Sequence, residues 1–355
     1  MTFTGSWPGV SERLMHPVSQ VIERNLPRHE AGDSGLWINP EKDGCWQQAA
    51  DACSSFKLFC QDHGCFRYLQ GSGANVGFGA FPDTDNGNYQ WVILNLPRQK
   101  ALLGMLLDCA ATLLNANGTL WLAGENRAGI KSSIKHLQSR FSRVSKLDSA
   151  RHCTLFTASG ISGETTFDPA VYREEWLLDS GSANLTVVSY PGVFAHGRLD
   201  PGTALLLDVI GAVPIEGAVL DFACGAGVIG ASIARRHEHA NLTLLDSNGL
   251  ALRACKETLA ANGLHGNVLA SDGLSELEGS FDLVISNPPI HDGVKTDTGM
   301  SKRLLDTVHD HLRPGGRLIM VANIHLPYEK WLTQTFRRCR QLASNEHYKV
   351  LGAEK

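Results

Sequence analysis

Short apolar runs recur through the C-terminal half of the chain, and each leads into glycine, an amide or an acidic residue. Their length and their β-branched residues predict buried strands at residues 218–222, 241–246, 267–272 and 281–286. Segments with helical spacing follow the strands, as at residues 231–236. Strands that alternate with amphipathic helices predict an α/β fold, with a mainly parallel sheet and helices on both faces.

The pattern occurs twice along the chain. Trp91–Pro97 resembles Leu283–Pro289, and each leads through a helix, a glycine turn and a strand to a second helix rich in Arg, Lys and His. Each copy then ends in a β-like segment, at Cys153–Ala158 and at Tyr348–Ala353. The repeat predicts duplication of one α/β domain, although any two βαβ units share part of such a pattern.

A cluster of Gly, Ser and Thr at residues 159–166 has no apolar periodicity and marks the expected boundary between the copies. A chain of 355 residues is also too long for one core. We therefore expect one domain at residues 1–160 and another at residues 161–355.

Composition narrows the class of protein without giving its chemistry. The chain is 43% apolar, and its longest apolar stretch is interrupted by Asp108, which predicts a protein without a membrane span. The nine cysteines form no C-x-x-C pair and no leader pattern begins the chain, so we expect reduced thiols, a cytoplasmic location and no metal site. A net charge of −4 argues against coating nucleic acid through global charge but leaves room for a local basic patch.

A glycine-rich run separates the first strand of the C-terminal half from a helix. Gly225, Gly227 and Gly230 form G-x-G-x-x-G in the strand–turn–helix context that a cofactor loop requires. Asp246 ends the next strand, about 20 residues later, where a carboxylate can accept hydrogen bonds from ribose hydroxyls. These features predict a ribose-containing cofactor. A nicotinamide dinucleotide also fits them, and a tight turn without a ligand is the simpler alternative.

An acidic residue before the loop favours S-adenosylmethionine over a dinucleotide. Asp221 stands four residues before Gly225, and D-x-x-C-G-x-G resembles the first motif of class I methyltransferases, where the acidic residue helps hold the methionine ammonium group. In that family the third strand ends beside the adenine, where Asp272 would contact the base, although Asp272 is also suited to cap a helix. The residues expected around the cofactor are Asp221, Ala223, Gly225, Gly227, Asp246, Ser247, Asp272, Gly273 and Asn287.

The fourth strand of the C-terminal half runs into Asn287-Pro-Pro-Ile290. The tetrapeptide resembles the N/D-P-P-Y/F motif of methyltransferases that modify nitrogens conjugated to π systems. Such a nitrogen is a poor nucleophile, and hydrogen bonds to the Asn287 side-chain oxygen and the Pro288 carbonyl would orient its lone pair. Pro288 and Pro289 restrict the backbone that carries this carbonyl. Ile290 replaces the usual aromatic residue, which puts base stacking at this position in doubt.

Longer segments resemble one family, the 16S ribosomal RNA (guanine-1207-N2)-methyltransferases, also called small-subunit methyltransferase C. The matching segments are Gly124–Arg127, Asp148–Arg151, Pro191–Phe194, Leu199–Asp200, Gly202, Leu205–Leu207, Cys224–Val228, Leu259–Gly263, Asn287–Pro289, His291–Gly293, Val321–Asn323 and Leu326–Tyr328. The resemblance implies two tandem class I methyltransferase-like, Rossmann-type domains, the first degenerate. It also implies methylation of a guanine N2 amine in 16S rRNA, with S-adenosylhomocysteine as product, by a monomer acting on ribosomal RNA or an assembling small subunit.

The N-terminal copy lacks the signals of an active site. Residues 36–44 place bulky and charged side chains where the glycine loop belongs, and Asn95-Leu-Pro97 lacks the first proline. We therefore expect this copy to support folding or to bind RNA. Its expected contacts are Arg127, Lys131 and Lys135, which with Arg143 and Lys146 would project from one side of a helix; a solvated surface helix is the alternative. Near the catalytic loop, the expected substrate contacts are Ile290, His291 and Lys295.

Other functions share parts of this pattern. A sister family that methylates guanine N2 in 23S rRNA has the same layout, and enzymes that methylate a protein glutamine or a DNA adenine use the same tetrapeptide. A non-catalytic RNA-binding factor for ribosome assembly is the third alternative. The complete set of Asp221, Gly225, Gly227, Asp246 and Asn287 argues against a decayed site.

Overall fold

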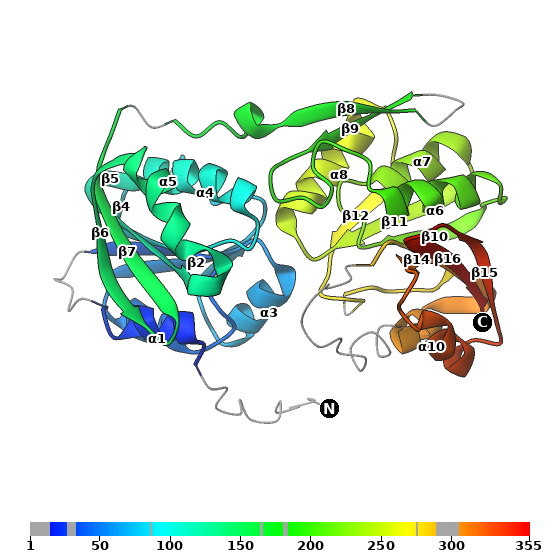
Figure 1. Ribbon diagram of the computed structural model, residues 1–355, viewed down its shortest axis with the longest axis horizontal. Coiled ribbons are helices and arrows are strands. Elements are labelled where there is room, and N and C mark those ends of the chain that lie inside the picture. The colour runs from blue at the N-terminus through cyan, green and yellow to red at the C-terminus, as the bar shows by residue number, and fades with distance from the viewer. Residues whose placement is uncertain are drawn as a thin grey trace, which may run out of the picture. The chain divides into compact units, whose positions relative to one another are not determined.

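The structure is a computed structural model of the 355-residue chain, and it describes residues 15–26, 33–85, 87–163, 166–179, 184–274, 276–288 and 305–355 (Figure 1). The chain divides into two compact units. The first comprises Met1–Cys60, Cys65–Gly77 and Pro82–Phe167, and the second comprises Gln61–Gly64, Phe78–Phe81 and Asp168–Lys355. The main division thus follows Phe167, whereas the boundary expected after residue 160 falls at the end of a strand.

The first unit is built on a seven-stranded sheet in the order β3-β2-β1-β4-β5-β7-β6. β1 pairs in parallel with β2 and β4, β4 pairs in parallel with β5, and β7 is antiparallel to β5 and β6. The strands are β1 (Ser34–Ile38), β2 (Ser55–Cys60), β3 (Val76–Phe78), β4 (Tyr89–Asn95), β5 (Leu114–Glu125), β6 (Phe141–Ala150) and β7 (Cys153–Ile161). The helices are α1 (Pro17–Glu23), α2 (Cys45–Asp51), α3 (His63–Gly71), α4 (Lys100–Leu113) and α5 (Ile134–Gln138).

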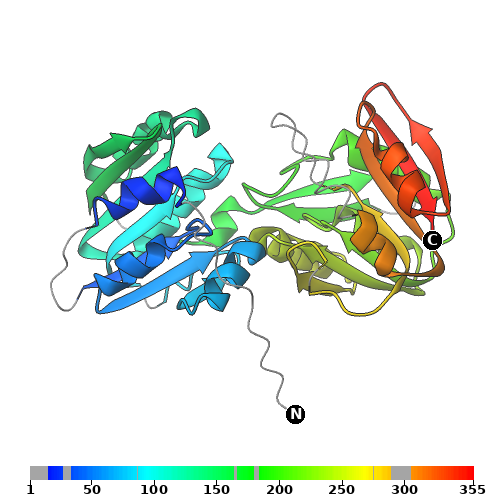
Figure 2. The same cartoon turned by 90° about the horizontal axis from the view of Figure 1, so that it is seen from below.

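The second unit repeats this architecture with the strand order β12-β11-β10-β13-β14-β16-β15. Figure 2 shows its ribbon in green through yellow to red. Its strands are β10 (Gly217–Phe222), β11 (Ala240–Asp246), β12 (Asn267–Ala270), β13 (Phe281–Ser286), β14 (Leu312–Asn323), β15 (Arg338–Ser344) and β16 (Tyr348–Glu354). The helices are α6 (Pro201–Gly211), α7 (Val228–Arg236), α8 (Gly249–Ala261) and α10 (Tyr328–Thr335). A separate hairpin, β8 (Glu174–Asp179) with β9 (Asn184–Ser189), packs on α8.

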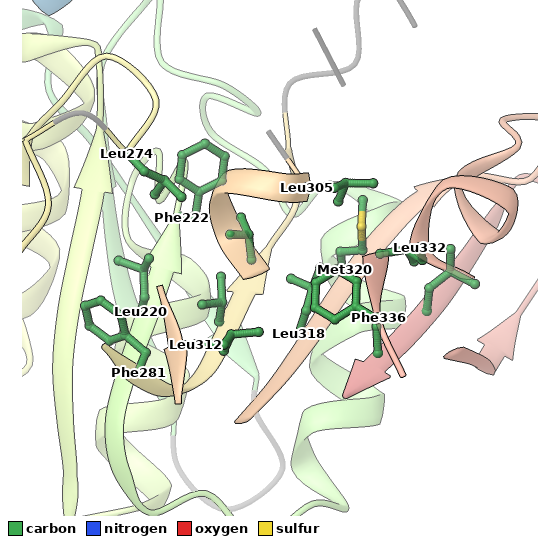
Figure 3. Packing of buried hydrophobic residues seen from close by; sticks show 14 of the residues in the cluster. Leu220, Phe222, Leu274, Phe281, Leu305, Leu312, Leu318, Met320, Leu332 and Phe336 are labelled. Atoms are coloured by element: carbon green, nitrogen blue, oxygen red, sulfur yellow. The ribbon is translucent and has the colours of Figure 1, made fainter. Parts of the chain in front are cut away.

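Buried apolar side chains on both sides of the second sheet fix the positions of the strands that carry the motifs. Leu220 and Phe222 of β10 belong to the same buried cluster as Leu318 and Met320 of β14 (Figure 3). Residues two apart along a strand face the same side of the sheet, so a shift of β10 or β14 by one residue would remove these side chains from the cluster. Burial therefore sets the register of each strand within the sheet. The ends of β10 and β13 are therefore held at fixed places on one edge of the sheet.

The two sheets match strand by strand, as the internal repeat predicts. Ile38 of β1 pairs with Leu94 of β4, and Phe222 of β10 pairs with Ser286 of β13. The next residue after each central strand has left-handed backbone, with φ 53° at Asn39 and φ 60° at Ala223. The common strand order and this shared turn confirm two domains of the same α/β fold.

One expected helix is wrong. Residues 126–150 form the 3-10 turns η1 (Asn126–Ala128) and η2 (Ile130–Ser133), then α5, and then the ten-residue strand β6. Gly129 has φ 94°, a left-handed conformation that ends the first turn and prevents a continuous helix. Lys131 and Lys135 remain on the helical segment and are exposed, but Arg143 and Lys146 lie on β6.

Candidate active site

The C-terminal ends of three neighbouring strands meet in the second unit. Phe222 at the end of β10 pairs with Leu245 of β11 on one side and with Ser286 of β13 on the other. The hydroxyl of Ser286 also donates a 2.7 Å hydrogen bond to the carbonyl of Phe222. The direction of the chain crossovers reverses at β10, and open α/β sheets bind ligands at such a point, outside the carboxyl ends of their strands.

The glycine loop follows β10 and begins α7. Gly225 and Gly227 have φ 55° and φ 79°, so both occupy the left-handed region that favours glycine. A Cβ added at Gly225 would meet nothing within 4 Å, whereas one at Gly227 would lie 2.8 Å from the sulfur of Cys255. Gly227 is therefore needed for packing inside the protein, and Gly225 leaves open space on the side where a ligand can approach.

Asp246, at the end of β11, holds the glycine loop. Its Oδ2 accepts a 2.9 Å hydrogen bond from the backbone N–H of Gly225, and its Oδ1 accepts one of 2.9 Å from Asn248. Burial raises the pKa of this carboxyl, and the backbone N–H donors act in the opposite direction. The side chain thus stands beside the loop, in the place expected for a contact with ribose hydroxyls.

Asp221 lies beneath the same loop. Its side chain is completely buried, and its Oδ2 accepts a 2.8 Å hydrogen bond from the N–H of Gly230. Its Oδ1 has no hydrogen-bond partner among the described residues. Burial raises the pKa of Asp221 to about 7. Asp221 thus supports the loop from below, and its contact with the methionine ammonium group stays a prediction.

The amide of Asn287, expected from the sequence to be catalytic, lies on the other side of the loop. Asn287 follows β13, and its Nδ2 donates to Asp200 Oδ2 at 3.1 Å and to Thr203 Oγ1 at 2.9 Å. Pro288 is buried. Asp200 is the N-cap of α6, and Thr203 lies in the first turn of that helix. The start of α6 therefore fixes how the Asn287 amide is turned.

A cavity connects the loop to this amide. It measures about 40 Å³ and is partly open to solvent. Its described lining is Trp176, Phe194, Ala195, Arg198, Leu199, Asp200, Thr203, Ala223, Cys224, Gly225, Ala226, Val228, Ile229 and Asn287. The cavity brings together Ala223, Gly225 and Asn287 from the expected set. Gly227 lies in the same turn.

Most of this lining lies outside the site residues expected from the sequence. Phe194 is 60% exposed although it is a large apolar side chain, and the buried indole N–H of Trp176 has no hydrogen-bond partner within the described ranges. Two of the segments that carry the family resemblance, Pro191–Phe194 and Leu199–Asp200, contribute to the lining. The family resemblance of these two segments is the sequence signal for this part of the cavity, because their spacing along the chain does not relate them to the glycine loop.

The remaining expected site residues are not in the described lining of the cavity or lie outside the described residues. Asp272 is exposed, and Gly273 follows it with φ 67° in a turn after β12. Ser247 directly follows Asp246. Asp246, Ser247 and Asp272 are not among the described cavity residues. Pro289, Ile290, His291 and Lys295 lie outside the described residues.

Cys224 also lines the cavity but is unsuited to act as a nucleophile. A hydrogen bond with Cys255 and burial both raise the pKa of its thiol well above the usual range. A thiolate is the reactive form of cysteine, so Cys224 stays a neutral, inert thiol beside the loop. The chemistry of the cavity therefore rests on amide and carboxylate groups.

The equivalent site of the first unit is filled by its own side chains. Asn95, at the end of β4, matches Asn287 by register, but its Oδ1 accepts a 2.9 Å hydrogen bond from the indole N–H of Trp37. Its Nδ2 donates to Glu41 at 3.3 Å, and the residue is only 6% exposed. Cys60 stands at the place of Asp246. This copy thus retains the amide, but its own side chains engage both the oxygen and the nitrogen of that amide.

The structure also bears on the expected RNA-contacting cations and on the metal sites and membrane spans considered in the sequence. Arg127 forms an ion pair with Glu125, while Lys131 and Lys135 are exposed. The described ranges contain no group of three or more His, Cys, Asp or Glu side chains that could hold a metal ion. In the same part of the chain, no helix is long and apolar enough to cross a membrane.

Both units match known protein families. The family Methyltransferase small domain N-terminal matches residues 19–176, and Methyltransferase small domain matches residues 184–352. Ribosomal RNA small subunit methyltransferase C of Shewanella amazonensis is 35% identical over 339 residues, which cover 95% of this chain and 98% of that protein. The protein of the same name from Pseudomonas entomophila is 44% identical over 263 residues, which cover 74% of this chain and 78% of that protein.

A solved structure shares the whole fold. The T. Thermophilus 16S rRNA N2 guanine-1207 methyltransferase (RsmC), in complex with AdoMet and guanosine, superimposes with a TM-score of 0.85 at 25% identity. The match covers 96% of this chain and 92% of that one. The fold and the site therefore define a class I methyltransferase with two tandem domains, of which the second carries the intact site. The chain belongs to the ribosomal RNA small subunit methyltransferase C family. The expected fold class, family and enzyme class are thereby confirmed.

Proposed function

We propose that this chain transfers a methyl group from S-adenosylmethionine to the N2 amine of a guanine in 16S ribosomal RNA of the small subunit. The observation that carries the proposal is the Asn287 amide, whose nitrogen is engaged by Asp200 and Thr203 while its oxygen is left to accept a hydrogen bond. The printed name of the relatives and the AdoMet and guanosine bound to the T. Thermophilus enzyme support the same donor and acceptor.

The residues around the glycine loop fit such a cofactor. Gly225 leaves open space where a Cβ would stand, and Asp246 presents a carboxylate beside it. Ala223 and Asn287 line the same cavity and would contact the cofactor there. When bound, S-adenosylmethionine supplies an electrophilic methyl group on a sulfonium.

Positioning of the amine is the main task of the protein. The N2 lone pair of guanine is delocalised into the ring, so the nitrogen attacks only when it is correctly oriented. The Asn287 oxygen and the Pro288 carbonyl accept its two N–H groups and direct the nitrogen toward the methyl group. Orientation and fixed dipoles of this kind lower a barrier without a strong base.

The target base also needs an apolar surface to lie against. Phe194 is an exposed aromatic ring in the cavity lining and supplies the face that Ile290 does not offer. Single bases removed from folded RNA are commonly held by aromatic stacking, and phosphate contacts elsewhere offset part of the unstacking cost. Lys131 and Lys135 of the first unit are suited to that second role, because both are exposed cations.

Asn287→Ala tests the assignment. We expect most methyl transfer to be lost, while the dissociation constant for S-adenosylmethionine, measured by calorimetry, stays near that of the unchanged protein. Asn95→Ala is the matched control, because it removes the equivalent amide from the filled copy and should leave turnover in place. Full turnover in Asn287→Ala would overturn the catalytic assignment.

The RNA target is a separate question. Mapping of radiolabelled methyl groups on ribosomal RNA from cells with and without the gene identifies the modified nucleotide. A label missing from 16S RNA supports the proposal, and one missing only from 23S RNA would replace it with the large-subunit alternative. Parallel assays with naked RNA and with small subunits show which of these is the substrate.

A further inference from the structure

We infer that Asp200 and Thr203 are positioning residues that fix the polarity of the Asn287 amide and thereby select an N–H donor over a carbonyl as the group presented to the methyl donor. The inference rests on the proposed function and adds the source of its chemical selectivity. Its basis is the junction between the start of α6 and the end of β13.

The contacts use the full donor capacity of the amide. An Asn side chain has two N–H bonds on one nitrogen and a carbonyl oxygen that only accepts. One N–H points to Asp200 Oδ2 at 3.1 Å and the other to Thr203 Oγ1 at 2.9 Å. A carboxylate accepts and does not donate, so the nitrogen, and not the oxygen, must face Asp200. Only Oδ1 remains for a ligand, and it has no partner among the described residues.

The two acceptors are themselves held in place. Asp200 Oδ2 also accepts a 2.8 Å hydrogen bond from the backbone N–H of Thr203 and so caps α6, and Pro201 fixes the first helical position. Thr203 is only 6% exposed, and α6 packs on β14 and β16. The acceptor pair is therefore part of a packed helix end, and turning the amide over would place its oxygen against the Asp200 carboxylate.

This arrangement separates donors from acceptors on the edge of a guanine. The N2 amine donates hydrogen bonds, whereas O6 accepts them. An amide that presents only oxygen binds the amine and repels the carbonyl, because two lone pairs would face each other. Donation to a carboxylate also polarises the amide and strengthens its oxygen as an acceptor. The same residues thus favour the amine and exclude the wrong edge of the base.

Thr203→Val and Thr203→Ser form a matched pair for the test. Val keeps the size of the side chain and the backbone N–H but removes the acceptor, while Ser keeps the acceptor. We expect kcat for methyl transfer to RNA to fall about tenfold in Thr203→Val and to return close to normal in Thr203→Ser, since one orienting hydrogen bond is worth about one power of ten in rate. KM and the dissociation constant for S-adenosylmethionine should change little. A kcat loss of equal size in both variants, or in neither, would overturn the inference.

Asn287→Asp probes the opposing carboxylate. A carboxylate at position 287 would face Asp200, so this variant should be inactive near neutral pH. Adding Asp200→Ser removes the opposing charge while Ser still caps α6, and part of the lost rate should return. Full activity of Asn287→Asp alone, or no recovery in the double variant with normal thermal unfolding, would contradict the geometry.

A measurement without turnover separates this inference from the proposed function. In the full chain labelled with ¹⁵N-asparagine, the side-chain amide signal of Asn287 is identified by its loss in Asn287→Ala. It should shift in Thr203→Val and stay near its original position in Thr203→Ser. If the unchanged protein fails to methylate RNA but the signals behave this way, the proposed function fails and the positioning contact stands. If RNA is methylated and the signal does not respond to Thr203→Val, the positioning contact fails alone.

Discussion

The N–H of Gly225 donates a 2.9 Å hydrogen bond to Asp246 Oδ2, so the residue that ends β11 holds the turn that follows β10. We expect the same carboxylate to receive ribose hydroxyls, so that one side chain would hold both the loop and the ligand. Such double use makes the side chain sensitive to replacement. It also means that a binding defect and a loosened loop should appear in the same variant.

Asp246→Ala should weaken binding of S-adenosylmethionine about ten- to a hundredfold, because hydrogen bonds to a charged acceptor are worth roughly 1.5–3 kcal/mol. Calorimetric titration measures the change. Asp246→Asn keeps one acceptor oxygen, so its affinity for S-adenosylmethionine should lie between that of the unchanged protein and that of Asp246→Ala. An unchanged affinity in the Ala variant would mean that the cofactor binds elsewhere.

Phe194→Ala should raise KM for RNA about tenfold and leave S-adenosylmethionine binding nearly unchanged. Stacking of a base on an aromatic ring is worth about 1–3 kcal/mol, and the 60% exposure of this ring means that its removal costs little folding stability. Phe194→Tyr retains a ring and is the control. A loss of cofactor affinity in place of RNA affinity would move Phe194 to the cofactor side of the cavity.

Asp221→Asn should gain stability relative to the unchanged protein as the pH rises. The folded pKa of Asp221 is about 7, whereas an unfolded Asp has a pKa of about 3.9. Between these values the folded chain binds more protons, so the group contributes stability below about pH 4 that is lost as the pH rises through 7. Asn cannot titrate but keeps an acceptor for Gly230. Urea unfolding of both proteins at pH 5 and pH 8 checks the sign, and a pH-independent difference would refute it.

Reversal of Lys131 and Lys135 to Glu should weaken RNA binding and flatten its dependence on salt. With fewer phosphate contacts, fewer counterions are released from the RNA when the protein binds. The same reversal at Arg143 and Lys146 gives an equal charge change on β6 and serves as the control. Filter binding across a salt series, beside a cofactor titration, compares the pairs. If both reversals act equally, general charge and not position is responsible, and if neither acts, the first pair is an ordinary solvated surface.

Local signals were enough to predict β10, β11, β12, β13, β16 and the loop of the second unit, but not β8, β9 or β15. The expected strand at residues 281–286 is β13 itself, and the glycine loop needed only Gly225 and Gly227 in the right place between β10 and α7. These features depend on periodicity and on backbone conformation within a few residues. The repeat then extended the same prediction to the first unit.

The rest of the site depends on contacts between distant parts of the chain. Asp200 lies 87 residues from Asn287 in sequence, and Thr203 lies 84 residues away. An Asp before a Pro predicts a helix start but not which side chain the cap will meet. In the first unit, Gly129 and strand β6 replace the expected helix because pairing with β7 prevails over local helical spacing.

The shared turn after the central strands has a consequence for how sites of this kind are interpreted. Asn39 and Ala223 are both left-handed; Ala223 lines the cavity of the second unit, whereas the amide of Asn95, next to Asn39 in the first sheet, is engaged by Trp37 and Glu41. Reversing the chain from a buried strand into a helix is thus sufficient to demand that conformation, with or without a ligand. The filled domain serves as an internal reference for what the architecture requires by itself. What the second unit adds to that reference is the open space at Gly225, the carboxylate of Asp246 and the free oxygen of Asn287, and these are the features that we expect to serve the ligands.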